Sequence, residues 1–441
     1  MNKTQRLFPW IILLLVAAPY LFSSTETTFH NFAGGMDGAD PVADLVYNPA
    51  NGMVYGTTKT GGAGPNCAAG CGTVFAIHSN GTGYTVIHRF AGGTTDGANP
   101  QAGLIIDANG NLYGTTYNGG THHLGTVFKL TPTGGGQFRE TILHSFAGGA
   151  DGANPLSRLA RNAAGTLYGT TFAGGTNALG TVLALQPSGL ESVLFSFTGP
   201  NGSHPRAGVV LDATGDLWGT TSVGGGANLG VVFRLTFNGN GWSESFLHSF
   251  TGSDGANPNA ALTLDAAGDV FGTARTGGFP ACSFAAAGCG VVFEFEQTGN
   301  GFSESTVYAF TGGADGAAPV ADLTLALDGA GAPYLFGTAS QAGVIGGTCP
   351  ATGCGTAFEL CGVGSSCQGS QSWTEFTLFE FVGRNGGRTP LGGMLVFLPV
   401  SADADPWDFP PGGKAKCTSG CMSAPSSGGA SGDGTLDGFT N

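Results

Sequence analysis

The sequence predicts an all-β propeller built from four-stranded blades. Three observations support this: one motif recurs along the whole chain, each copy contains four strand-like runs, and the copies are spaced like propeller blades. Each copy ends in a phenylalanine, and the spacing runs from 51 residues (Phe146 to Phe197) to 71 residues (Phe310 to Phe381). Periods of about 50 residues are typical of propellers and solenoids. The full series is Phe32, Phe90, Phe146, Phe197, Phe250, Phe310 and Phe381.

The second copy shows the blade most clearly. Its strand-like runs are Ala102–Asp107, Asn111–Tyr117, Thr126–Thr131 and Glu140–Phe146. The first two are joined by Asp-Ala-Asn-Gly, a strong hairpin signal. Four antiparallel strands with short hairpins form one propeller blade. The 3.6-residue period of a helical solenoid is missing from the sequence.

The two ends of the chain suggest how the ring closes. Six complete blades run from about Pro41 to Phe381, while Thr27–Phe32 matches a lone fourth strand and Leu391–Leu398 a lone first strand. We therefore predict a seventh, incomplete blade closed by the N-terminal strand, because closure leaves no sheet edge open. A six-bladed ring is the alternative.

The C-terminal segment matches a blade only loosely. Residues 405–413 align with 216–225, and Cys417–Cys421 takes the place that Cys67–Cys71 has in the first blade. No third-strand motif follows in that alignment, and prolines fall within the second-strand region, where they are disfavoured. We expect residues 399–441 to be a degenerate repeat remnant with a Gly/Ser-rich tail, disordered from Ser423.

The composition and the N-terminal segment indicate where the protein is found and which partners are excluded. The 441 residues are 41% hydrophobic and 10% charged, with a net charge of −14. An acidic chain without a basic patch argues against nucleic acid. Residues 1–24 combine Lys3 and Arg6 with an apolar run from Leu7 to Phe22, the pattern of a secretory signal. A retained anchor is the alternative, and membrane association is expected only in that case. We therefore expect a secreted or cell-envelope monomer with its repeat domain at residues 25–398.

Ten cysteines fall into five close pairs. An even count in an exported chain indicates disulfides, and the spacing does not match the short Cys-x-x-Cys motifs of zinc sites. We predict the bonds Cys67–Cys71, Cys282–Cys289, Cys349–Cys354, Cys361–Cys367 and Cys417–Cys421.

Three motifs resemble a known family. They are GNLYGTTYNGG from Gly110, LGTVFKLTP from Leu124 and ILHSFAGGADGANP from Ile142. These motifs recur six times in fixed order over residues 29–398, and they resemble the choice-of-anchor tandem-repeat family called the GloVer (Gloeo/Verruco) repeat. The resemblance implies an exported bacterial repeat protein whose relatives end in different surface-anchoring tails. This C-terminus shows no sortase-like motif, apolar span or basic end, so anchoring is expected only through the N-terminal segment.

One face of the predicted propeller collects the variable loops. Connections from fourth to first strands and from second to third strands emerge together there, including most cysteine pairs, and loops on a rigid scaffold commonly bind ligands. Each fourth-to-first loop carries an acid or its amide. A carboxylate ring could bind calcium, whereas an Asx turn needs only the side-chain oxygen. The two asparagines favour the turn. The residues are Asp37, Asp96, Asp151, Asp254 and Asp315, with Asn201 and Asn385 in the other two loops.

Histidines and aromatics also recur at fixed positions. His30, His88, His144 and His248 share one place on the outermost strand, so a packing role is expected rather than metal binding. His122, His123 and His204 lie on the loop face as candidate ligand contacts. One second-strand position is aromatic in every blade, and inter-blade packing is favoured over sugar stacking. These residues are Tyr55, Tyr113, Tyr168, Trp218, Phe271 and Phe336.

The sequence supports binding more than catalysis. We expect an exported repeat scaffold that binds carbohydrate, protein or surface ligands through the loop face. No cofactor is expected, and calcium is the alternative. A secreted hydrolase or lyase acting on polysaccharide is one alternative, since Arg206, Arg384 and Arg388 depart from the other copies. A purely structural envelope protein is the other. No catalytic residue is assigned.

Overall fold

A computed structural model describes the strands and most connections of the repeat region. The described residues are 25–278, 282, 287–299, 301–327, 332–343, 349, 351–362, 373–381, 388–392, 395–396, 421–423, 425–427 and 435–440. The predicted signal, residues 1–24, lies outside them. Among the described residues, no helix is long and apolar enough to cross a membrane.

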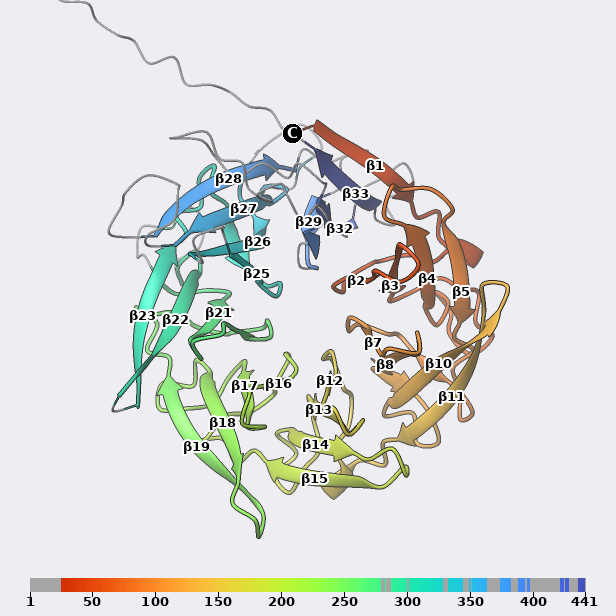
Figure 1. The fold of residues 1–441 in the computed structure, drawn as a ribbon, viewed down its shortest axis with the longest axis horizontal. Coiled ribbons are helices and arrows are strands. Elements are labelled where there is room, and N and C mark those ends of the chain that lie inside the picture. The colour runs from red at the N-terminus through yellow and green to blue at the C-terminus, as the bar shows by residue number, and fades with distance from the viewer. Residues whose placement is uncertain are drawn as a thin grey trace, which may run out of the picture.

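The chain forms a β-propeller, as predicted (Figure 1). Four-stranded antiparallel sheets are arranged in a ring, with the first strand of each nearest the centre and the fourth outside (Figure 1). Blade 1 contains β2 (Val46–Asn48), β3 (Met53–Thr58), β4 (Thr73–His78) and β5 (Thr85–Arg89). Blade 2 contains β7 (Ile105–Ile106), β8 (Leu112–Thr116), β10 (Thr126–Gly134) and β11 (Gln137–Ser145).

The next blades repeat this order. Blade 3 contains β12 (Ala160–Arg161), β13 (Leu167–Thr171), β14 (Thr181–Leu185) and β15 (Glu191–Ser196). Blade 4 contains β16 (Val210–Leu211), β17 (Leu217–Thr221), β18 (Val231–Phe237) and β19 (Trp242–Ser249). Blade 5 contains β20 (Thr263–Leu264), β21 (Val270–Ala274), β22 (Val291–Thr298) and β23 (Gly301–Ala309). Blade 6 contains β25 (Thr324–Leu327), β26 (Pro333–Gln341), β27 (Thr356–Cys361) and β28 (Thr374–Glu380), and β24 (Ala317–Pro319) pairs the far end of β26.

A seventh sheet joins the two ends of the chain. Its order is β30 (Leu395–Val396), β31 (Cys421–Ser423), β33 (Thr435–Thr440) and β1 (Thr25–Asn31). The N-terminal strand is therefore the outer strand of a sheet whose other strands come from the C-terminal region, as predicted. In Figure 1 this sheet lies between β28 of blade 6 and blade 1.

The register of the seventh sheet corrects the alignment of the C-terminal segment. Ser423 pairs with Asp437, and in blade 2 the corresponding pair is Gly114 and Phe128. Leu395 pairs with Met422, and the corresponding pair is Ile105 and Tyr113. Cys421 thus lies on the second strand rather than in a loop. The expected disorder is wrong for Thr435–Thr440, which pairs along β1. Residues 405–413 lie outside the described residues.

Short ladders tie the loops of one face together. The fourth-to-first loop pairs with the second-to-third loop through β6 (Gly97–Ala98) and β9 (Asn118–Gly119) in blade 2. β29 (Arg388–Pro390) and β32 (Pro425–Ser427) do the same in the seventh sheet. The 3-10 turns η1 (Gly35–Asp37) and η2 (Gly149–Asp151) lie in these loops. The two loop types therefore share one face, as predicted.

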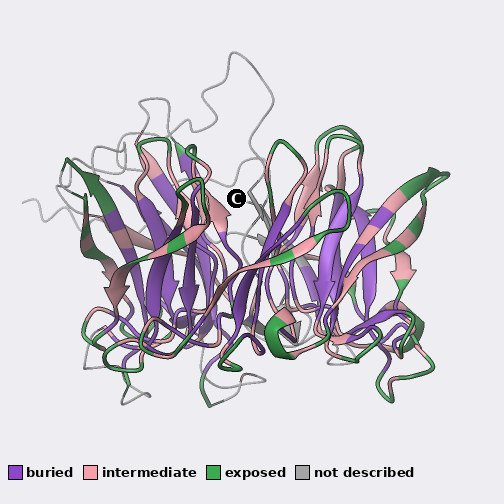
Figure 2. Cartoon of the chain, turned by 90° about the horizontal axis from the view of Figure 1, so that it is seen from below, coloured by how far each residue is buried: buried purple, intermediate pink, exposed green. Residues whose placement is uncertain are grey.

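The core lies between neighbouring blades. Each repeat-ending phenylalanine is fully buried, and five of them pack on a third-strand phenylalanine of the next blade, as Phe90 does on Phe128 at 5.1 Å between ring centroids. That phenylalanine in turn covers the second-strand glycine, here Gly114. Figure 2 shows buried residues running along the strands, with exposed residues at the two loop faces. A phenylalanine that ends one blade thus fixes the position of the next.

Aromatics on the second strands also pack between blades. Tyr55 contacts Phe138 at 6.1 Å, Tyr168 contacts Trp242 at 6.2 Å and Trp218 contacts Phe302 at 4.9 Å between ring centroids. In each pair the second ring comes from the next blade. These contacts confirm inter-blade packing.

The Asp-x-x-Gly hairpins form as predicted, and Asp212 shows how. Its Oδ1 accepts hydrogen bonds from the Thr214 and Asp216 backbone N–H groups and from the Thr214 hydroxyl, and its Oδ2 accepts one from the Trp218 indole at 2.9 Å. Burial acts to raise the pKa of Asp212, but these hydrogen bonds outweigh it and hold the pKa below its usual value. The ionised carboxylate therefore stabilises the turn.

Replacing Asp212 by asparagine is expected to destabilise the fold in a pH-dependent way. Because the folded-state pKa is depressed, the carboxylate stabilises fully above its unfolded pKa of about 3.9, and the effect is lost as pH falls through the folded value. We expect Asp212→Asn to cost about 1–2 kcal/mol at pH 7 and less at pH 3, measured by urea unfolding. Asn162 caps the same turn of blade 3 through the Thr166 N–H, so the amide fits. An equal cost at both pH values would contradict the prediction.

Candidate functional site

The recurring loop acids cap the backbone at the outer ends of the blades. Asp37 accepts the Ala33 N–H at 2.8 Å, Asp96 the Ala91 N–H at 2.6 Å and Asp315 the Thr311 N–H at 2.7 Å. Asn201 accepts the Thr198 N–H at 2.8 Å in the same way. The interpretation of these residues as turn-forming is therefore confirmed, and their oxygens are largely committed to their own loops.

The same acids also contact the outer strand of their own blade. His30 lies 3.0 Å from Asp37, His144 3.0 Å from Asp151 and His248 2.8 Å from Asp254. Tyr308 donates its hydroxyl to Asp315 at 3.1 Å. Each acid thus lies at a different blade junction beside a fourth strand. The ring of carboxylates around the axis that calcium binding required is not formed by these residues.

A glutamate from the next blade completes three of these junctions. Sequence reasoning missed this residue, which stands four positions before the histidine site on the outer strand. A bulge between the two positions puts them on opposite faces, so the glutamate faces the previous blade and the histidine site faces the next. We call the resulting groups the rim clusters. They are His88, Asp96 and Glu140; His144, Asp151 and Glu191; and His248, Asp254 and Glu304.

The rim glutamates are electrostatically strained when ionised. Burial, and then the negative charge of Asp96, raise the pKa of Glu140 to about 8. Burial and Asp151 raise the pKa of Glu191 to about 7. Burial lowers the pKa of His88, since it disfavours the imidazolium. Two facing carboxylates of one junction therefore need a proton or another cation between them.

The loop-face histidines do not gather into a site. His122 and His123 are exposed beside each other in the second-to-third loop of blade 2. His204 packs against Phe172 at 4.9 Å between ring centroids, and the Arg206 guanidinium lies over the same phenylalanine at 5.1 Å. Burial and then the Arg206 charge lower the pKa of His204. Arg384 lies outside the described residues, and nothing is described of the Arg388 side chain.

Three of the predicted disulfides are present with both partners in the described residues. They are Cys67–Cys71, Cys282–Cys289 and Cys349–Cys354, with Cα atoms 5.1–5.3 Å apart. Cys361 is also disulfide-bonded. Cys367 and Cys417 lie outside the described residues, as does the side chain of Cys421. The three bonds close second-to-third loops of blades 1, 5 and 6, on the face where sequence reasoning placed them.

The axis of the ring is narrow, because residues of the first strands and their preceding loops line it. Arg158 extends across it to Asp322 at 3.4 Å, and Asp322 also accepts the Ala261 N–H at 2.6 Å. A β-carbon on Gly208 would lie 2.2 Å from the Arg158 carbonyl oxygen, so the first strands approach closely. The remaining axial cavity measures about 90 Å³. That volume is too small for a sugar or a peptide.

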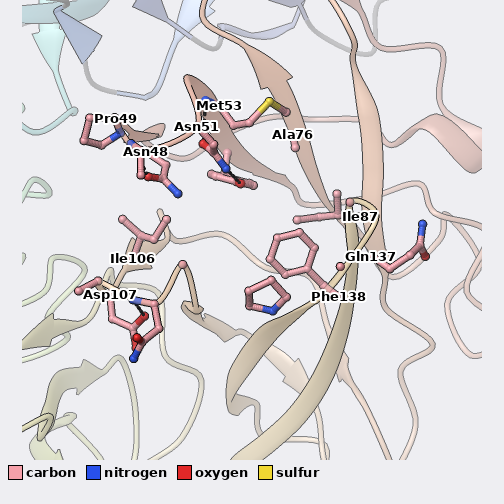
Figure 3. A pocket seen from close by; sticks show the side chains of 18 of the residues that line it. Asn48, Pro49, Asn51, Met53, Ala76, Ile87, Ile106, Asp107, Gln137 and Phe138 are labelled. Atoms are coloured by element: carbon pink, nitrogen blue, oxygen red, sulfur yellow. Dashed lines mark hydrogen bonds between the residues drawn. The ribbon is translucent and has the colours of Figure 1, made fainter.

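A larger groove lies between blades 1 and 2 on the hairpin face. Its volume is about 720 Å³, within the usual range for ligand sites. Figure 3 shows Asn48 and Asn51 on one side of the groove, Ile106 and Asp107 on another, and Phe138 at its end. Tyr55, Met53 and Ile87 add apolar lining, and the amides of Asn109 and Gln137 belong to the flanking hairpins.

The groove has a specific origin in the sequence. Ala76 lines it at a third-strand position that holds Lys129 in blade 2 and Arg234 in blade 4. Blade 3 also has an alanine there, Ala184, but the facing hairpin of blade 4 carries Trp242, which packs against the cluster containing Ala184. The combination of a small Ala76 and a moderate Phe138 therefore opens this junction.

The carboxylate in the groove, Asp107, is hydrogen-bonded within its own hairpin. Asp107 Oδ1 accepts the Asn109 and Asn111 backbone N–H groups, and its Oδ2 accepts the Asn111 amide and the Tyr113 hydroxyl. Burial acts to raise the pKa of Asp107, but these hydrogen bonds outweigh it and lower the pKa. No lysine, arginine or histidine is among the groove's lining residues. The groove is therefore suited to a ligand without net charge.

Comparison with known proteins supports the fold and the family. Residues 20–183 and 157–394 match the Gloeobacter/Verrucomicrobia repeat. No curated protein sequence matches the chain. The extracellular domain of a protein assigned as a one-component system of B. thetaiotaomicron aligns with a TM-score of 0.50 and 9% identity, over 94% of this chain and 40% of that one.

Two further solved structures are similar at lower scores. A gluconolactonase from Xanthomonas campestris aligns with a TM-score of 0.41 and 15% identity, over 71% of this chain and 86% of that one. A structure of the nidogen/laminin complex aligns with a TM-score of 0.38 and 14% identity, over 59% of this chain and 77% of that one. The repeat match extends over most of the 441 residues. The chain belongs to the Gloeobacter/Verrucomicrobia repeat family.

Proposed function

We propose that this protein is an exported binding module whose groove between blades 1 and 2 holds an uncharged oligosaccharide. The proposal depends on the lining of the groove. Aromatic and aliphatic side chains form part of the lining, amide side chains lie beside them, and no lining residue is basic. Apolar ring faces and a few placed polar groups are the usual composition of such sites. Export is supported by the disulfides Cys67–Cys71, Cys282–Cys289 and Cys349–Cys354, since such bonds persist in oxidising compartments.

The proposal differs from the sequence-based expectation in the face that it uses. The loops with the disulfides lie on one face, whereas the groove lies among the hairpins of the other. Hydrolysis of the ligand is disfavoured at this site, because glycosidases use a pair of carboxyl groups. Asp107 is the one acid among the groove's lining residues, and its oxygens already accept four hydrogen bonds.

Filling the groove is expected to abolish binding without unfolding the propeller. The change Ala76→Lys introduces the residue that blade 2 carries as Lys129, and Phe138→Trp introduces the residue that blade 4 carries as Trp242. On a glycan array of neutral oligosaccharides, the wild type is expected to bind and both variants to lose at least about tenfold in affinity, or about 1.4 kcal/mol. Thermal unfolding checks that both variants remain folded.

The control tests the opposite face. His122→Ala together with His123→Ala alters the exposed loop-face histidines and is expected to leave glycan binding unchanged. If both groove variants still bind glycan and the loop-face variant does not, the binding site lies on the loop face. Release of a shortened glycan would establish an enzyme instead.

A further inference from the structure

Three blade junctions bring one imidazole and two carboxylates together. In each rim cluster, a histidine nitrogen, an aspartate oxygen and a glutamate oxygen all lie within 4.8 Å of one another. His144 lies 3.0 Å from Asp151, His248 lies 2.8 Å from Asp254, and His88 lies 3.6 Å from Glu140. The histidine and the aspartate come from one blade and its loop, and the glutamate from the next blade.

Buried atoms in these clusters have no hydrogen-bond partner. Oε1 of Glu140, of Glu191 and of Glu304 has essentially no solvent contact and no partner among the described residues, and the same holds for His88 Nε2. A buried polar atom left unpaired costs about 1–3 kcal/mol. Oε1 of Glu244, at the junction between blades 3 and 4, is unpartnered as well within the described part of the chain. The unpaired oxygen therefore recurs at four junctions, and at three of them a histidine and an aspartate lie beside it.

The clusters also lack a positive charge that would balance their acids. Each holds two carboxylates and one imidazole. A divalent cation would cancel both negative charges at once, while a single proton cancels one.

A fourth junction shows what happens when the histidine is missing. Between blades 3 and 4 the corresponding residues are Phe195, Asn201 and Glu244. There the Asn201 amide donates to Glu244 Oε2 at 3.0 Å. The imidazole and the aspartate charge are thus lost together, and an amide hydrogen bond takes over the contact with the glutamate. At the junction between blades 5 and 6 the aspartate remains without a histidine, since Tyr308 donates its hydroxyl to Asp315. The joint loss of histidine and aspartate is therefore particular to the junction of blades 3 and 4.

We propose that the three rim clusters are zinc sites, each joining two neighbouring blades through one histidine, one aspartate and one glutamate. Three protein ligands of this kind leave one tetrahedral position for water. An imidazole ligand suits zinc, whereas calcium takes six to eight oxygens. Bonds of about 2.0–2.1 Å in tetrahedral geometry place ligand atoms about 3.3 Å apart, close to the contacts above.

The test counts zinc ions per chain. Purified full-length protein is treated with EDTA, titrated with zinc chloride by calorimetry at pH 7.5, and analysed for metal after gel filtration. We expect three zinc ions per chain and a rise in melting temperature with zinc. A chain that retains no zinc would overturn the proposal and assign the clusters to proton-sharing hydrogen bonds.

Exchange variants localise the ions by borrowing residues that another junction already carries. His144→Phe with Asp151→Asn copies the pair Phe195 and Asn201, so it is expected to fold and to bind two ions. The reverse exchange, Phe195→His with Asn201→Asp, is expected to raise the count to four.

The last variant excludes surface histidines. His122→Ala with His123→Ala is expected to keep three ions. An unchanged count in both exchange variants, or a lower count in this surface variant, would overturn the assignment.

Discussion

Replacing Leu436 by alanine, five positions before the last residue, is expected to lower the free energy of unfolding by about 3 kcal/mol. Leu436 is fully buried on β33, in a cluster with Phe32, Val54, Phe75 and Ile77. The cluster joins the closing sheet to blade 1. Truncating a buried leucine removes apolar burial and leaves a cavity, and both destabilise the fold. Urea unfolding of the full chain measures the change.

The matched control is the same substitution at an exposed site. Leu190 is 60% exposed on the hairpin before β15, so Leu190→Ala is expected to change the free energy of unfolding by less than about 0.5 kcal/mol. Equal effects of the two substitutions would show that β33 does not close the ring in solution. Deleting residues 435–441 is expected to do more damage than Leu436→Ala, because it also exposes the edge of β1.

The propeller itself was predictable because each of its parts is repeated. A phenylalanine every 51 to 71 residues and a hairpin signal in most copies specify a blade, and the lone strands at the two ends specify the closure. The third strand of the closing sheet was missed. Its motif is reduced to Gly434-Thr435-Leu436, and by register Asp437 takes the place of Phe128. Gly and Ser around it give the composition of a disordered tail.

The rim clusters were only half predictable. The histidine and aspartate recur within one copy and stand out in the sequence. The glutamate also recurs, at Glu140, Glu191 and Glu304, but its partners belong to the previous copy. Nothing in a single repeat shows which outer strand faces which loop. Which outer strand faces which loop depends on how the ring closes, and the spacing of the motifs does not show how it closes.

The groove could not have been predicted, because it depends on the size of two side chains. Ala76 is unremarkable within its strand, and it matters only because Phe138 of the next blade is too small to fill the space. Blade 3 has the same alanine and no such groove among the described cavities, since Trp242 packs there. Differences between copies therefore carry the binding site, whereas the shared residues build the blades.

The glycine that recurs on each second strand tests most directly whether the residues shared by the copies build the blades. Gly114 lies under the Phe128 ring, and a β-carbon there would lie 2.6 Å from Phe128 Cζ and 2.8 Å from Leu104 Cδ2. The Phe128 ring is fully buried and held against Phe90, so the ring is the neighbour that cannot give way. We expect Gly114→Ala to cost about 2–3 kcal/mol through overpacking, measured by urea unfolding.

Gly169 supplies the matched control, because blade 3 carries Leu183 where the other five complete blades carry phenylalanine. A β-carbon on Gly169 would come close to one atom, Leu159 Cδ2 at 2.8 Å, at the end of a flexible side chain. We expect Gly169→Ala to be nearly neutral, because the smaller entropy of the unfolded chain offsets a small adjustment of Leu159. If both substitutions cost the same, the glycine would be conserved among blades for backbone reasons. If only Gly114→Ala lowers the free energy of unfolding, then the third-strand phenylalanine is the reason why its blade needs a glycine on the second strand.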